Sequence, residues 1–259
     1  MGPVKSFNQA TEVGPSGEPR ETIYSPTMNL LKIFFSPDEV FRDVAERAQW
    51  VVPFVAVLVL SLAASIVVIN TIGLEKIVRD QLESNQRMAD QLGEKKIEQI
   101  AQDADTPLRR NMSYGSALLG SALSMLVTAG VFTALLAIVA AQPGFKKVLG
   151  VTSYSFFAYS LVTTTISCVV LYLTKDSGNV DIKRLVNLNP SILMDPSTSN
   201  KALFSLATSF DLTSFWLIFL LGLGYSKISK TVSLGKSLGI VIGVWLIWIL
   251  GKAGLSLVF

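Results

Sequence analysis

Histidine is absent from this 259-residue sequence, and cysteine occurs once, at Cys168. Without histidine the chain has no His-based general acid or base, no Ser-His or Cys-His nucleophilic pair and no histidine ligand for a metal or haem. A single cysteine cannot form a disulfide within the chain, and Cys168 inside an apolar segment is typical of a small packed residue. These absences argue against the common catalytic and metal-binding classes.

Charge is also scarce, because Asp, Glu, Lys and Arg make up only 16% of the residues. The net charge of +3 is spread along the chain, so no basic surface for nucleic acid is expected. The sequence shows neither a Gly-rich phosphate loop nor paired carboxylates within apolar sequence. We therefore expect no catalytic residue, no cofactor and no metal.

Long apolar segments dominate what is present, in a chain that is 50% hydrophobic. Each is long enough to cross a hydrocarbon core of about 30 Å as a helix. They predict an all-α, polytopic membrane protein with five transmembrane helices. The predicted spans cover about residues 50–72, 113–140, 148–173, 203–226 and 234–257.

The first 27 residues are rich in Pro, Gly, Ser and Glu and lack the apolar core of a signal peptide. We expect a disordered tail over residues 1–27, followed by one membrane domain over residues 28–259. Ser36, Pro37 and Glu39 predict a capped helix start. That helix carries apolar residues on one face and charges on the other, so we expect an amphipathic helix lying at the membrane surface.

A charged connection, residues 73–112, separates the first two spans. Glu75 and Arg79 lie four residues apart, a spacing that supports a helix. Gly93 is expected to divide the connection into two helices. Two interpretations are open, namely a solvated helical loop and a docking surface for a partner.

Small residues recur at spacing four within three spans. In membranes such stripes let two helix backbones approach closely, and they also occur at oligomer contacts and lined cavities. All three roles are open here, and for the last span we expect Gly239→Leu to destabilise the fold. The stripes are Gly235, Gly239 and Gly243; Ser116, Gly120, Ser124 and Thr128; and Ser160, Thr164 and Cys168.

Asp211 and Lys252 are ionisable residues within apolar sequence. Charges at membrane depth are rare and tend to pair, so a direct intramembrane ion pair is one interpretation. In the other, Asp211 caps the fourth helix and Lys252 extends its ammonium group to the interface.

Several segments follow one another in a characteristic order: residues 31–42 (LKIFFSPDEVFR), Trp50, residues 146–155 (KKVLGVTSYS), residues 211–216 (DLTSFW) and residues 223–225 (LGY). Together these segments resemble the Yip domain family of Ypt/Rab-interacting membrane proteins, especially its prokaryotic branch. The resemblance covers about residues 30–257. It implies a five-helix membrane domain with a cytoplasmic N-terminus. Eukaryotic members take part in vesicle traffic and bind prenylated small GTPases, a role that does not carry over to prokaryotic members.

The functional hypothesis is an interaction or membrane-organising module of the cell (inner) membrane, without catalytic activity. Its expected partners are the lipid bilayer and a membrane or cytoplasmic protein, with homo-oligomer formation left open. The alternative is a small transporter or channel with a polar site near Asp211 and Lys252. A membrane enzyme is the third and least favoured class.

The topology follows from the positive-inside rule. Lys146 and Lys147 lie in the short second connection, and Lys227, Lys230 and Lys236 lie around the fourth. Excess lysine in short loops favours the cytoplasmic side, which gives a cytoplasmic N-terminus and an external C-terminus.

Cysteine labelling tests this topology. In a Cys168→Ser background, single cysteines at Gln91 and Ser229 are treated on intact cells with a thiol reagent that does not cross membranes. Gln91→Cys should react and Ser229→Cys should not. The reverse pattern would show the opposite orientation.

Overall fold

The computed structural model describes residues 25–83, 86–139, 141–174, 189–194 and 201–258, and regular structure in these ranges is helical throughout. Most of the predicted tail and of the third connection falls outside the described residues. The helices are α1 (Pro26–Lys32), α2 (Pro37–Arg47), α3 (Val51–Ile72), α4 (Leu74–Glu83), α5 (Gln86–Leu92), α6 (Glu94–Ala104), α7 (Pro107–Ile138), α8 (Phe145–Thr174), η3 (Pro190–Leu193), α9 (Lys201–Ala207), α10 (Leu212–Ile228) and α11 (Leu234–Val258).

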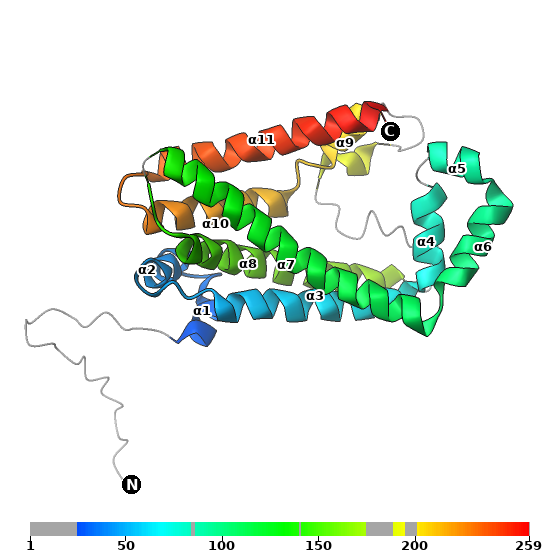
Figure 1. Cartoon of the computed structure of the whole chain (residues 1–259), viewed down its shortest axis with the longest axis horizontal. Helices are drawn as coiled ribbons and strands as arrows, with labels where there is room; N and C mark the ends of the chain where they lie inside the picture. Colours follow the sequence, from blue (N-terminus) through cyan, green and yellow to red (C-terminus); the bar gives the residue numbers. More distant parts are fainter. Residues whose placement is uncertain (1–24, 84–85, 140, 175–188, 195–200, 259) are drawn as a thin grey trace, which may run out of the picture.

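The longest helices run lengthwise in a bundle formed by α3, α7, α8, α10 and α11 (Figure 1). Helices α1 and α2 lie at one end of this bundle, which we call the α2 end. At the α2 end α3, α8 and α11 begin, and α7 and α10 end. The opposite end carries α4–α6, α9 and the C-terminus. Both lysine-bearing connections therefore lie at the α2 end.

Four helices of the described chain are long and apolar enough to cross a membrane: Val51–Ile72, Pro107–Ile138, Phe145–Leu173 and Leu234–Leu255. These four correspond to the first, second, third and fifth predicted spans. The second begins earlier than predicted, because Thr106 caps it by accepting a hydrogen bond from the Arg109 backbone N–H at 3.4 Å.

The fourth predicted span is not one continuous helix. It is divided into α9 and α10, and α10 has 17 residues, about 25 Å at 1.5 Å per residue. The break falls at Thr208–Asp211. There Ser209 donates its hydroxyl hydrogen to the Ser205 carbonyl and Asp211 caps α10. Such short polar side chains compete with backbone helix bonds and favour helix ends. A fifth span stays a prediction.

Helix α2 forms as predicted, with Ser36 at the N-cap and Pro37 at the first position. The side-chain cap expected from Ser36 and Glu39 does not form, because the Ser36 side chain makes no capping hydrogen bond. The helix is amphipathic, as expected, and it lies at one end of the bundle, where its apolar face meets protein. Val40, Phe41 and Val44 are 0% exposed, because this face packs against α8 and α10.

Helices α4, α5 and α6 lie in the charged connection. Gly93 separates α5 from α6 with φ +72°, as the sequence predicts. Helices α4 and α6 pack together. Arg79 of α4 forms an ion pair with Glu98 of α6 at 2.8 Å, which joins the two helices, and a second ion pair with Glu75 of its own helix at 2.8 Å. The connection is thus a folded helical unit.

Close backbone approach occurs at glycines other than those predicted. A Cβ atom on Gly150 of α8 would lie 2.8 Å from Val44 Cγ1 and 3.3 Å from the Gln49 carbonyl oxygen. A Cβ on Gly224 of α10 would collide with Val151 and lie 3.1 Å from the ring of Phe41. By contrast, added Cβ atoms on Gly235, Gly239 and Gly243 meet nothing within 4 Å. The stripe of α11 is therefore not a close-packing face within this chain.

Glycine substitutions distinguish these positions. We expect Gly224→Ala to lower the stability of the detergent-solubilised protein by about 1–3 kcal/mol, because the added methyl group overpacks a closed contact. Gly239→Ala is the matched control in α11 and should be tolerated. Thermal unfolding of the two variants measures the difference. Equal melting temperatures would show that α2, α8 and α10 are not closely packed at Gly224.

Candidate binding surfaces of the membrane domain

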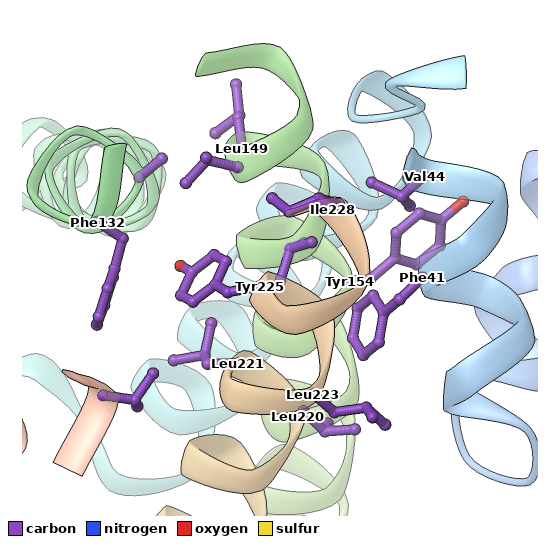
Figure 2. Close-up of a cluster of buried hydrophobic side chains, with 14 of the residues drawn as sticks. Phe41, Val44, Phe132, Leu149, Tyr154, Leu220, Leu221, Leu223, Tyr225 and Ile228 are labelled. Atoms are coloured by element: carbon purple, nitrogen blue, oxygen red, sulfur yellow. The ribbon is translucent and has the colours of Figure 1, made fainter. Parts of the chain in front are cut away.

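The core of the α2 end is built from aromatic residues of four helices. Phe41 of α2, Tyr154 of α8 and Tyr225 of α10 are buried together, with Phe132 of α7 beside them (Figure 2). The rings of Phe132 and Tyr225 have centroids 4.8 Å apart. The Tyr225 hydroxyl is hydrogen-bonded to the Thr152 hydroxyl at 2.9 Å, so this buried polar group is satisfied.

Polar contacts attach α1 to the same core. The Tyr154 hydroxyl donates to the Pro26 carbonyl at 3.2 Å. The buried Asn29 side chain donates to the Asp43 carboxylate at 3.1 Å and to the Gln49 amide oxygen at 3.4 Å. Helices α1 and α2 are thereby held in one orientation on the bundle.

The outer face of α2 carries charges and forms what we call the α2 platform: Asp38, Glu39, Arg42, Glu46 and Arg47. Three ion pairs order its first half. Lys32 bonds Glu39 at 2.9 Å, Arg42 bonds Asp38 at 2.8 Å, and Lys227 of α10 bonds Asp38. Arg42, Glu46 and Arg47 remain exposed.

A second surface is an apolar groove between α7 and α11, which we call the lateral groove. Its volume is about 470 Å³. Side chains of α8 and α10 line it between the two outer helices. The lining residues are Ser124, Val127, Thr128, Val131, Phe132, Phe156, Ser214, Leu217, Ile218, Leu221, Val241, Val244, Trp245 and Trp248.

The lateral groove lies within the apolar lengths of α7 and α11. Val131 and Val241 lie about two turns from the α2 end of their helices, and Ser124 and Trp248 lie about four turns from it. At 1.5 Å per residue the groove therefore extends from about 10 to about 21 Å along the bundle. On α7, α10 and α11 the lining residues follow the spacing i, i+3, i+4, i+7 of one face.

The four small residues of the α7 stripe lie in two different surroundings. Ser116 and Gly120 are exposed, whereas Ser124 and Thr128 line the lateral groove. The sequence left a lined cavity open as one of three roles. A contact that the stripes did not indicate joins α3 to α7, where the hydroxyls of Ser61 and Ser121 are hydrogen-bonded at 2.6 Å.

The stripe of α8 meets α3. Thr164 and Cys168 line a cavity of about 120 Å³ together with Ala64, Val67 and Val68. Cys168 is a free cysteine and is partly buried. Small residues therefore leave space at this helix pair.

Asp211 and Lys252 lie at the end of the bundle where α10 begins. Asp211 is 8% exposed, and its carboxylate accepts hydrogen bonds from the backbone N–H of Thr213, at 2.8 Å, and from the Thr213 hydroxyl. Lys252 Nζ donates to Thr208 Oγ1 at 3.1 Å and to Ser209 Oγ at 3.4 Å. The described contacts thus join each residue to neighbouring hydroxyls and not to the other. Direct coupling between them stays a prediction.

Residues 235–239, Gly-Lys-Ser-Leu-Gly, match the spacing of a nucleophile elbow. Ser237 lies inside α11 and is 1% exposed, whereas an elbow serine sits on a strand-to-helix turn. The chain also has no histidine to activate it. Among the described residues no group of three His, Cys, Asp or Glu side chains could hold a metal.

These features define a multi-pass helical membrane protein with a charged platform at one end and an apolar groove on its side. The model of the Yip1 domain matches residues 31–255. Because this match covers most of the sequence, the chain belongs to the Yip1 domain family. No curated protein and no solved structure matches the chain in the comparisons.

A double-mutant cycle tests the two interpretations of Asp211 and Lys252. The observed contacts predict that Asp211→Asn and Lys252→Met destabilise independently and add within about 0.5 kcal/mol. Detergent unfolding of both single variants and the double variant gives the coupling. As a control, Lys252→Met and Thr208→Val should couple, because Lys252 bonds Thr208. Strong coupling between Asp211 and Lys252 would instead support the direct ion pair.

Proposed function

We propose that the protein is a Yip-type interaction module that presents the α2 platform to a protein partner and performs no catalysis. The observation that carries the proposal is the anchoring of α2. Its apolar face is 0% exposed at Val40, Phe41 and Val44, while Arg42, Glu46 and Arg47 point away from the bundle. The platform is thus a charged helix held in place.

Anchoring of this kind favours recognition. Burial of one large apolar side chain stabilises by about 1.5–3 kcal/mol, so three such residues hold α2 firmly. The ion pair between Lys227 and Asp38 adds a contact to the end of α10. A partner that binds an ordered helix loses less conformational entropy than one that must order it.

The proposed orientation places the α2 platform in the cytoplasm and the C-terminus outside the inner membrane. The support is charge placement, since the lysines of both short connections lie at the α2 end. A partner for the platform is then a cytoplasmic protein or the cytoplasmic part of a membrane protein.

A transporter site at Asp211 and Lys252 was the alternative hypothesis. The Asp211 carboxylate caps α10 and the Lys252 ammonium bonds two hydroxyls of the α9–α10 turn. Both contacts are those of a structural turn, and a transported ligand is not needed to explain them.

Photocrosslinking in living cells tests the platform. A photoreactive amino acid replaces Glu46, and its adducts are identified by mass spectrometry. We expect a defined protein adduct that disappears in Arg47→Glu, because the partner binds through the charged side chains of α2.

The matched control is Arg109→Glu, which makes the same charge change on an exposed arginine at the opposite end of the bundle. It should keep the adduct. If all three proteins, present at equal levels, give the same adducts or none, the platform is not the partner's binding surface.

A further inference from the structure

The lateral groove has room for part of another molecule, and its apolar lining favours an apolar one. Phe132, Phe156 and Leu221 line it together with the exposed faces of α7 and α11. In water such a groove would favour another protein. Here it lies on helices that are long and apolar enough to span a membrane, between about 10 and about 21 Å from the α2 end. Acyl chains are the molecules present at that depth.

Charge at the α2 end of the bundle favours one class of lipid. Sequence positions 106–175 and 212–259 contain no acidic residue, so the four helices around the groove and their two short connections are free of carboxylates. Lys146, Lys230 and Lys236 are exposed at the α2 end, where α7 ends and α11 begins. Among the described residues, no ion pair or side-chain hydrogen bond involves these three ammonium groups.

We propose that the lateral groove binds one acyl chain of an anionic phospholipid, whose headgroup lies among Lys146, Lys230 and Lys236 at the α2 end. The small side chains of Ser124 and Thr128 leave the room that the chain occupies on α7. Trp245 and Trp248 flank the chain on α11. This inference uses a different surface from the α2 platform and does not depend on it.

Tryptophan fluorescence tests the proposal directly, because Trp248 lines the groove and is 72% exposed. A variant that keeps only Trp248 carries Trp50→Phe, Trp216→Phe and Trp245→Phe. It is reconstituted in phosphatidylcholine vesicles that contain a small fraction of brominated phosphatidylglycerol or of brominated phosphatidylcholine. Bromine on an acyl chain quenches a tryptophan that it touches.

We expect the brominated anionic lipid to quench Trp248 several-fold more than the brominated zwitterionic lipid at the same mole fraction. Lys146→Gln, Lys230→Gln and Lys236→Gln should each lower this preference by up to roughly fivefold, the effect of one basic residue near an anionic surface. The control tryptophan is Val59→Trp with the four native tryptophans replaced by phenylalanine. Val59 lies on the exposed face of α3 and is not one of the residues that line the lateral groove, so it should show no lipid preference.

Equal quenching of Trp248 by both brominated lipids would overturn the proposal, since it would show ordinary contact with bulk lipid. Shielding of Trp248 from both lipids would also overturn it and would point to a second copy of the chain in the groove. If the tryptophan replacements prevent folding, native mass spectrometry tests the proposal instead. It uses the chain with its native tryptophans in mixed phosphatidylglycerol and phosphatidylcholine. Thr128→Phe should lose the bound anionic lipid that the wild type and Val59→Phe retain, and equal retention by all three would refute the proposal.

Discussion

The contact on which the rest of the structure depends is the seating of α2 against α8 and α10. Gly150 and Gly224 have no side chain at the two points where Val44 and Phe41 approach these helices. Inside a bundle, absence of a Cβ atom allows helices and rings to come close and gain dispersion contacts. That contact turns an amphipathic helix, which by itself would favour a membrane surface, into part of the protein core.

Several polar contacts depend on this seating. With α2 in place, Asp38 meets Lys227, and Asn29 of α1 reaches Asp43 and Gln49. Between α8 and α10, on which α2 packs, the buried Tyr225 hydroxyl is hydrogen-bonded to Thr152. A charged face is thereby presented at one end of a membrane domain, and the proposed protein interaction rests on that presentation.

The lateral groove arises in a different way. Helix α7 packs on α3 and α8, whereas α11 packs on α10 and α9. Side chains of α8 and α10 therefore form the floor of the space between α7 and α11. Ser124 and Thr128 are too small to fill the space that remains on α7. A lipid chain is the natural complement of such a surface, since a bilayer contains no water to occupy it.

The sequence by itself determined the class of protein. Apolar segments of spanning length give helices in a membrane regardless of their neighbours, because every backbone polar group must be satisfied within the segment. The helix start at Pro37 and the break at Gly93 were predictable because both depend on local backbone preferences. The family was predictable because its pattern is carried by the order of segments along the sequence. The capping role of Asp211 was one of two interpretations, and it too is a local signal.

Only the tertiary structure decided which surfaces meet. Spacing four made Gly235, Gly239 and Gly243 candidates for a packing face, yet the close contacts fall at Gly150, Gly222 and Gly224, which belong to no such stripe. Periodicity tells which residues share a face, and it does not tell what that face meets. The apolar face of a helix such as α2 can meet either lipid or protein, because both favour the same apolar residues. The choice between them depends on the positions of α8 and α10, which are far away in the sequence.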